Sequence, residues 1–220
     1  MKINEFFQKG YYINLDRRTD RREHFEAEMR RVGLEGFFER VPGIEAPADI
    51  GMLKHGYYGD VHHSVLKRAK EAGYERIVLF EDDMMFYDDG ETPGLELVER
   101  SLDQLQKISD WDIIYFGGHP TSSEIPLVDE NLCKLDSGVL TTHAMGYHIR
   151  GIEKTLPYIP YKDSAIDQWL ACRSNIQKYM TYPLACPQIA GVSDLDAWGS
   201  SPGPLHFVST YYSSKYIKQY

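Results

Sequence analysis

The chain has 220 residues, 42% of them hydrophobic, which is enough for one globular domain with a core of its own. The formal net charge of −9 and the isoelectric point near 5.4 argue against a general nucleic-acid binder, because a phosphate backbone is held by clustered positive charge. The sequence has no run of roughly 20 apolar residues to span a bilayer and no signal-peptide pattern at its start, so we expect a cytoplasmic protein without a transmembrane segment. Three cysteines without CxxC spacing predict free thiols.

Strands and helices are predicted to alternate in the first part of the chain. Apolar runs bounded by turn residues predict strands at 10–15, 36–44, 76–80 and 111–118. Helical spacing between them joins Phe25, Met29 and Val32, then Val61, Val65 and Ala69, then Leu95, Val98, Leu102 and Leu105. We expect Asp60 to cap the second of these helices and Gly73 to end it. This alternation predicts an α/β fold, a single Rossmann-like domain with a mainly parallel central sheet.

Beyond residue 120 the predicted elements are shorter and more mixed. Residues 138–149 are expected to be extended, and 151–159 and 164–174 to be helical. Residues 182–194 predict a strand followed by a loop, and the last ten residues give no prediction.

Three adjacent carboxylates, Glu81, Asp82 and Asp83, follow the strand predicted at 76–80. In open α/β sheets ligands bind outside the carboxyl ends of the strands, so this is an informative position. Hard oxygen ligands on such a turn suit Mg²⁺ or Mn²⁺, completed by water and substrate phosphates. The alternative is a solvated acidic turn, and spacing alone does not decide between the two.

A basic segment follows the first predicted strand, with four exposed arginines expected around the start of a helix: Arg17, Arg18, Arg21 and Arg22. Backbone N–H groups and guanidinium groups there can receive phosphate oxygens. The alternative is a solvated arginine face balanced by Asp16, Asp20 and Glu23. An acidic and a basic site at neighbouring strand ends together predict a metal-bridged diphosphate substrate.

Five segments of the chain occur in the order seen in a known family: YYINLDRRTDRREHFEAEM, GDVHHSVLKRAKEAGYERIVLFEDDMMF, WDIIYFGG, HAMGYHIRGIEKTL and IDQWL. On these segments the chain resembles glycosyltransferase family 25, the lipopolysaccharide and procollagen galactosyltransferase type, over about residues 10–195. One element departs from the family pattern: where a Gly-x-x-x-Ser-His element is usual, Gly59 and His62 or His63 only approximate it.

The resemblance implies a single domain of the GT-A type over residues 1–220. Within it, residues 10–120 would form a nucleotide-sugar-binding half and residues 121–210 an acceptor-side half. The implied reaction is an inverting transfer of galactose or another hexose from a donor such as UDP-galactose to a glycan, lipid-linked or protein acceptor. No nucleic-acid partner is expected, and peripheral membrane contact stays open.

The resemblance also assigns roles to particular residues. Asp83 and then Asp82 would bind Mn²⁺ or Mg²⁺, and Glu81 would organise the ribose or the loop. The remaining candidates for the nucleotide and the donor pocket are Asn14, Asp16, Arg17, Arg21 and His143. His206 is a candidate late metal ligand.

Inversion by single displacement needs a base near the acceptor hydroxyl, and Asp167 is the candidate. The alternative for Asp167 is a first-turn carboxylate favoured by the helix dipole. We expect His24 and His148 to be hydrogen-bonded structural residues, and the tryptophans to serve in packing.

Two other functions stay open at this stage. The domain could bind the same nucleotide and metal as a nucleotide-sugar hydrolase or a nucleotidyltransferase, since a fold does not fix its reaction. It could also bind a glycan or nucleotide without turnover. An acidic cluster without an ion would then be a liability, which disfavours this last alternative.

Overall fold

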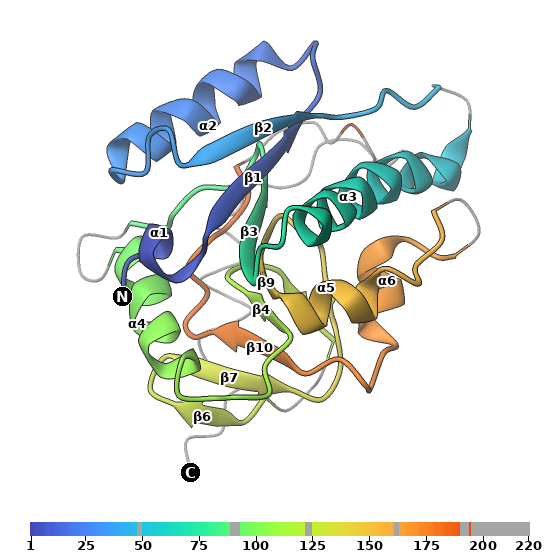
Figure 1. Ribbon diagram of the computed structural model, residues 1–220. Helices are drawn as coiled ribbons and strands as arrows, with labels where there is room; N and C mark the ends of the chain where they lie inside the picture. Colours follow the sequence, from blue (N-terminus) through green and yellow to red (C-terminus); the bar gives the residue numbers. More distant parts are fainter. Residues whose placement is uncertain (48–49, 89–92, 122–124, 161–162, 190–193, 195–220) are drawn as a thin grey trace.

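A computed structural model describes residues 1–47, 50–88, 93–121, 125–160, 163–189 and 194, and within these it has the expected α/β architecture (Figure 1). The strands of the main sheet are β1 (Lys9–Asn14), β2 (Phe38–Pro42), β3 (Arg76–Glu81), β4 (Ile113–Tyr115), β6 (Leu127–Asp129), β7 (Leu132–Leu135), β9 (Ala144–His148) and β10 (Lys178–Thr181). Their order across the sheet is β2-β1-β3-β9-β4-β10-β7-β6. Two short strands, β5 (His119–Pro120) and β8 (Val139–Leu140), pair separately.

The main sheet is mixed but mostly parallel. β1 pairs in parallel with β2 and β3, and β4 does so with β10. β9 is antiparallel to both of its neighbours, β3 and β4, and β7 is antiparallel to β10 and β6. β7 and β9 therefore run opposite to the other strands of this sheet. In the parallel register Ile13 lies opposite Glu81, so the carboxyl ends of β1 and β3 lie side by side.

Helices cover both faces of the sheet (Figure 1). One face carries α1 (Ile3–Phe6), α2 (Thr19–Arg31) and α4 (Gly94–Leu105), and the other carries α3 (Lys54–Glu71), α5 (Ile149–Thr155) and α6 (Ile166–Ala171), with the 3₁₀ turn η1 (Gly51–Leu53) before α3. Successive side chains of β3 point to opposite faces of the sheet and so belong to two hydrophobic cores. Ile77 and Leu79 pack towards α3, while Val78 and Phe80 pack towards α2 and α4.

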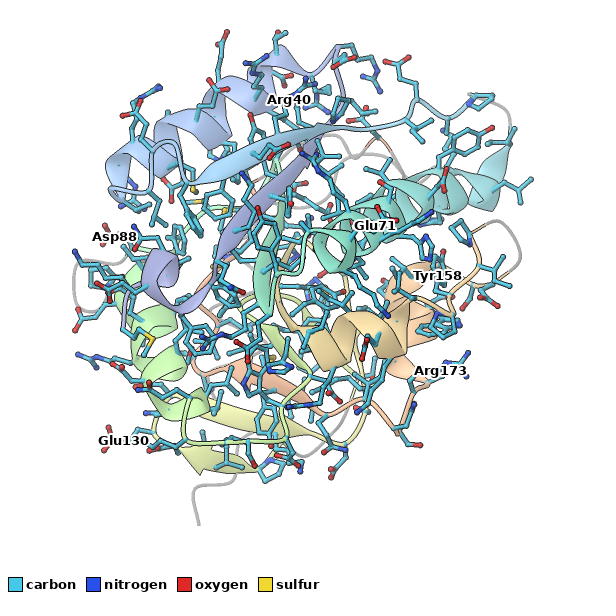
Figure 2. The ribbon with its side chains drawn as sticks, viewed as in Figure 1. Arg40, Glu71, Asp88, Glu130, Tyr158 and Arg173 are labelled. Atoms are coloured by element: carbon cyan, nitrogen blue, oxygen red, sulfur yellow. The ribbon has the colours of Figure 1, made fainter. Side chains whose placement is uncertain are left out.

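The second major helix begins earlier than the sequence predicts. α3 starts at Lys54, so Asp60 lies inside the helix, and the prediction that it caps the helix is wrong. Gly59 lies inside this helix, at a point where α3 packs closely against its neighbour. A Cβ on Gly59 would lie 2.3 Å from the hydroxyl oxygen of Tyr158, whose side chain is labelled in Figure 2. The predicted end is confirmed, since Gly73 has a φ of 75° in open space.

The extended segment predicted at 138–149 is interrupted by a turn. β8 ends at Leu140 and β9 begins at Ala144, and between them Thr141 has a φ of 75°, the only positive φ of a non-glycine residue in the described part of the chain. The strand predicted within 182–194 is misplaced. The strand β10 ends at Thr181, and the following residues form only an isolated bridge between Gln188 and Met84.

The expected free thiols and hydrogen-bonded histidines are confirmed, as is the packing role of two of the three tryptophans. The three cysteines are unpaired, and Trp111 and Trp169 are buried in the cores, while Trp198 lies outside the described residues. His24 bonds the Met84 carbonyl, and Nδ1 of His148 accepts from the Arg150 backbone N–H at the start of α5. No helix within the described ranges combines the length and apolar content needed to cross a bilayer.

Candidate functional site

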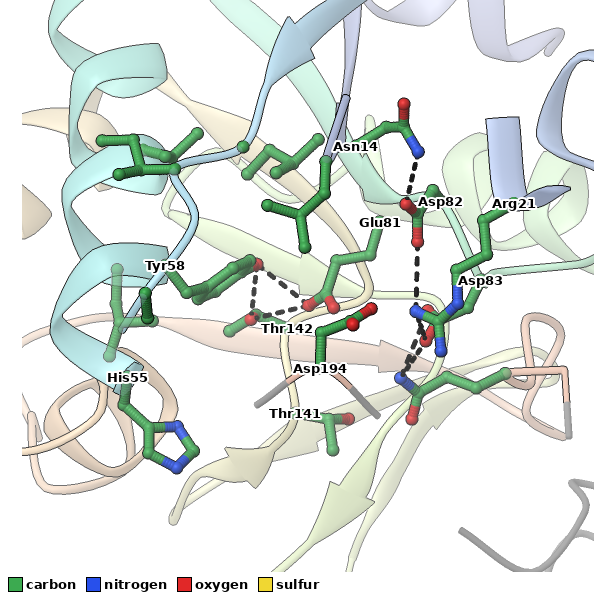
Figure 3. A pocket seen from close by; sticks show the side chains of 18 of the residues that line it. Asn14, Arg21, His55, Tyr58, Glu81, Asp82, Asp83, Thr141, Thr142 and Asp194 are labelled. Carbon is green, nitrogen blue, oxygen red and sulfur yellow. Dashed lines mark hydrogen bonds and ion pairs between the residues drawn. The ribbon is translucent and has the colours of Figure 1, made fainter. Parts of the chain in front are cut away.

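A cavity of about 320 Å³ lies at the carboxyl ends of β1 and β3. Its walls come from the turns after β1, β2 and β3, from α3, from the turn before β9, from the start of α6 and from the segment after β10 (Figure 3). It brings together seven of the residues predicted from sequence: Asn14, Arg17, Arg21, Glu81, Asp82, Asp83 and Asp167. These residues are far apart in sequence, and the parallel register of β1 and β3 is what places the first six together.

The two aspartates of the acidic cluster are buried around one guanidinium group. Nη1 of Arg21 donates to Oδ1 of Asp82 at 3.2 Å and to Oδ2 of Asp83 at 3.0 Å. Asn14 donates to the other oxygen of Asp82 at 2.7 Å, and Gln188 donates to Asp83 at 3.3 Å. Burial raises the pKa of Asp82, and the hydrogen bond from Asn14 opposes this. A cationic centre therefore sits between Asp82 and Asp83.

The donor set is compatible with a divalent ion. The Arg21 guanidinium stands in for a cation between two carboxylates, and Mg²⁺-type sites commonly use one or two carboxylates plus substrate phosphates and water. No group of three or more His, Cys, Asp or Glu side chains poised for a metal occurs among the described residues, and His206 lies outside them. Within the described residues the pair Asp82 and Asp83 therefore supplies two carboxylates, fewer than a complete protein shell for such an ion.

Glu81 belongs to a different hydrogen-bond network from the two aspartates. Its Oε1 accepts from the Tyr58 hydroxyl at 2.9 Å and from the Thr142 hydroxyl at 3.2 Å. Burial, and then the charge of Asp83, raise the pKa of Glu81 to about 8. Tyr58 also contacts His62, whose Nε2 lies 2.9 Å from the Tyr147 hydroxyl. Glu81 therefore faces α3 and the turn before β9, and it lines the cavity.

The basic side of the cavity is also internally paired. Arg17 and Arg18 both bond the carboxylate of Asp194, and Nε of Arg17 lies 3.0 Å from Glu45. Asp16 does not line the cavity. Its exposed side chain pairs with Arg40, which also donates to the side chain of Asn14 at 2.8 Å.

Asp167 reaches the cavity from the first turn of α6. Its Oδ2 accepts from the backbone N–H of Thr141 at 3.0 Å, and its Oδ1 accepts from the N–H of Gln168 at 2.7 Å. The carboxylate thus holds the turn at Thr141. His143 lies behind this turn, buried, with Nδ1 near the Thr141 hydroxyl at 3.0 Å and Nε2 near the Cys186 carbonyl at 2.8 Å, and it does not line the cavity.

Seven further polar side chains line the cavity and were not predicted: Glu45, His55, Tyr58, Thr141, Thr142, Gln188 and Asp194. Tyr58 and Thr142 adjoin the segments that carry the family resemblance, so their neighbours gave a signal. Gln188 and Asp194 gave none. Asp194 is 176 residues from its partner Arg18, and only the fold joins them.

Solved structures with a related arrangement are distant. A197 from STIV has a TM-score of 0.48 at 7% identity and covers 84% of this chain and 86% of its own. UDP-glucose pyrophosphorylase complexed with UDP-glucose has a TM-score of 0.44 at 10% identity, covering 79% of this chain and 72% of its own. A glycosyltransferase involved in the glycosylation of the major capsid of PBCV-1 has a TM-score of 0.37 at 9% identity, covering 66% and 62%. These likenesses are too remote to carry a further conclusion.

Sequence comparison is more specific. The chain matches no model of a known protein family. It is 30% identical over 128 residues to a glycosyltransferase 25 family member of Aedes aegypti, covering 49% of this chain and 20% of that protein. It is 25% identical over 181 residues to the inactive glycosyltransferase 25 family member 3 of Homo sapiens, covering 71% and 30%. The match spans less than a third of either relative's length. By sequence, then, the chain is similar to members of glycosyltransferase family 25, and the resemblance that its motifs carry is confirmed.

Proposed function

We propose that the chain is a metal-dependent hexosyltransferase of the GT-A type that uses a nucleoside diphosphate sugar such as UDP-galactose. The observation that carries this proposal is the placement of a buried aspartate pair and an arginine turn around one cavity at the ends of β1 and β3. Asp82 and Asp83 hold the divalent ion, Mn²⁺ or Mg²⁺. When bound, the ion supplies positive charge to the departing diphosphate.

The donor is held by residues of the two strand ends. Asn14 orients Asp82 through its 2.7 Å hydrogen bond, and Arg17 offers its guanidinium to phosphate oxygens. Arg21 is the cation between Asp82 and Asp83 in the ligand-free protein, and with an ion held by these aspartates its guanidinium would be available to the phosphates. Donor-binding residues thus come from the half at 10–120, and the half at 121–210 supplies the acceptor side.

Asp167 serves as the base on the acceptor side. The acceptor hydroxyl attacks the anomeric carbon, the bond from that carbon to the diphosphate oxygen breaks, and Asp167 takes the hydroxyl proton. Its hydrogen bond from the Thr141 N–H fixes the direction of the carboxylate, which lines the cavity. Attack from the face opposite the leaving group inverts the anomeric centre. The acceptor is a glycan, a lipid-linked sugar or a protein.

Titration calorimetry with UDP tests the donor site. Affinity in Mn²⁺ is expected to exceed affinity in excess chelator, because without the ion the diphosphate would face the net negative charge that Arg21 leaves on Asp82 and Asp83. Equal affinity in the two conditions would remove the metal from the proposal.

One alternative has a specific observation in its favour: the human relative, and a mouse relative 33% identical over 94 residues, are both named inactive. A domain that binds the donor without turnover would bind UDP and Mn²⁺ yet leave a labelled donor intact with every acceptor. Release of free sugar without an acceptor would identify a hydrolase. Pyrophosphate-dependent breakdown of the donor would identify a nucleotidyltransferase.

A further inference from the structure

Two consecutive arginines of the turn after β1 hold one carboxylate from the far end of the described chain. Arg17 donates from Nη2 to Oδ1 of Asp194, and Arg18 donates from Nη1 to Oδ2 at 2.5 Å. Each oxygen of Asp194 therefore faces its own guanidinium group. Two arginines can bind two oxygens of a phosphate group in the same way, each guanidinium group pairing with one negatively charged oxygen.

Asp194 differs from the other carboxylates near these arginines. Asp20 also pairs with Arg18, at 2.8 Å, but its side chain is 65% exposed and lies outside the cavity. The side chain of Asp194 is 18% exposed and lines the cavity, where Figure 3 shows it among the other lining residues. Glu45 also lines the cavity, but it pairs with Arg17 alone, whereas Asp194 lines the cavity and contacts both guanidinium groups.

The charge state of the cluster is settled by its contacts. Burial alone would raise the pKa of Asp194, but the hydrogen bonds from Arg17 and Arg18 outweigh it, and the pKa lies below its ordinary value. Asp194 is therefore ionised at neutral pH. Its negative charge offsets one of the two guanidinium charges, and Glu45 and the aspartate pair also line the cavity.

We propose that Asp194 is a resident anion in the diphosphate subsite, which holds Arg17 and Arg18 in the ligand-free protein and leaves them when the diphosphate of a nucleotide binds. The identity of the nucleotide rests on the proposed function, but the competition between Asp194 and a diphosphate does not. A diphosphate carries more negative charge than one carboxylate, so the exchange strengthens the pairing of both arginines. The partly exposed position of Arg17, 52% exposed, leaves the ligand a way in.

The test measures the binding of inorganic pyrophosphate in metal-free buffer with chelator. Asp194→Asn keeps the shape of the side chain and removes its charge, so pyrophosphate is expected to bind roughly tenfold more tightly than to the wild type. Asp20→Asn removes a charge from the same Arg18 outside the cavity and is the matched control, with a change within about twofold. Asp194→Ala is a second variant, and circular dichroism melts confirm that all three are folded.

Unchanged or weaker pyrophosphate binding in both Asp194 variants would overturn the proposal. An equal gain in Asp20→Asn would also overturn it, because the effect would then follow net charge alone. Repeating the titrations with UDP and Mn²⁺ separates the two ideas. If the Asp194 variants bind pyrophosphate more tightly but no variant binds UDP, the proposed function is wrong and the anion site stands. If UDP binds but the Asp194 substitutions change neither affinity, the anion site is wrong and the proposed function stands.

Discussion

At the scale of single residues, Asp83 and Asp167 are proposed to have different roles, so their substitution by asparagine should affect donor binding and transfer differently. Asp83→Asn removes charge from the aspartate pair, and Mn²⁺-dependent UDP binding is expected to weaken together with transfer. Calorimetry and single-turnover transfer measure the two effects. Asp88→Asn is the control, because Asp88 is an exposed carboxylate of the same loop that pairs with Arg31. UDP binding that is insensitive to Asp83→Asn would contradict the metal assignment.

Asp167→Asn should leave donor binding intact, since the amide oxygen can still accept from the Thr141 N–H and only the bond from the Gln168 N–H is lost. Transfer is expected to fall by something on the order of 10²–10⁴, the usual contribution of a general base. Wild-type transfer rates would make Asp167 the residue that holds the Thr141 turn and no more. Donor affinity lost as fully as in Asp83→Asn would instead move it to the donor site.

The buried side chain of His62 leads us to expect that the free energy of unfolding depends on pH. It is fully buried, and burial, with a smaller effect from His63, lowers its pKa to about 3. Between about pH 6.5 and pH 3 the unfolded chain binds a proton at this residue and the folded chain does not, so stability falls as the pH falls. The loss from pH 6.5 to 4.5 is on the order of 2–3 kcal/mol.

Urea unfolding of His62→Gln from pH 7.5 to 4.5 measures this contribution. The variant loses hydrogen bonds to Tyr58 and Tyr147 and starts less stable, but its stability should fall less steeply with acid. His63→Gln, at a partly exposed neighbour, should keep the wild-type slope. Parallel slopes for His62→Gln and the wild type would show that another group carries the acid sensitivity.

Arg21 lies in an environment that its residue type and its sequence neighbours did not predict. Its place among charged neighbours predicted an exposed side chain, whereas the structure buries it between Asp82 and Asp83. Sequence reasoning found seven of the residues that line the cavity, because strand ends and charge were visible in the pattern. It could not find which charges cancel in the ligand-free protein, since those pairs form across 61 residues for Asp82 and 177 residues for Asp194 with Arg17.

At the scale of elements, Gly59 fixes how closely α3 approaches the segment after α5. A Cβ there would lie 2.3 Å from the hydroxyl oxygen and 2.9 Å from a ring carbon of Tyr158, which is buried and contacts Trp169. Overpacking of this kind costs about 1–3 kcal/mol, and the better helix propensity of alanine recovers about 1 kcal/mol. Gly59→Ala should therefore lower the free energy of unfolding.

Chemical denaturation of Gly59→Ala and of Ser64→Ala measures this effect. Ser64 lies on the exposed side of α3, and its change to alanine should be close to neutral. A Gly59→Ala protein as stable as the wild type would mean that Tyr158 yields without strain. The start of α3 was not predicted, because the close approach of Tyr158 that suits a glycine at position 59 is not visible in the sequence.

At the scale of the whole molecule, a ligand that binds only the folded state raises its stability by mass action. A matching nucleoside diphosphate sugar at 100 times its dissociation constant adds about 2.7 kcal/mol, or roughly 5–10 °C in Tm for a chain of this size. A thermal-shift screen of nucleotide sugars with Mn²⁺ present measures this. Sugars linked to a nucleoside monophosphate are the control, and we expect them to stabilise less, since they lack the second phosphate.

Equal stabilisation by monophosphate-linked and diphosphate-linked sugars would contradict a diphosphate subsite.

At this scale the α/β class was predictable from the alternation of apolar runs. The order of strands was not, because nothing local in residues 144–148 tells that they run against β3 and β4. Periodicity reports which segments are strands, and long-range pairing decides their neighbours.

That insertion of β9 sets the order in which the protein can assemble during its synthesis. β3 and β4 leave the ribosome before the strand that separates them, and both neighbours of β4, β9 and β10, come later in the chain. Nascent chains that end before Ala144 therefore expose unpaired strand edges, which are templates for wrong pairing and targets for chaperones. Protease resistance of the ribosome-bound chain should accordingly appear only once Thr181 has cleared the exit tunnel.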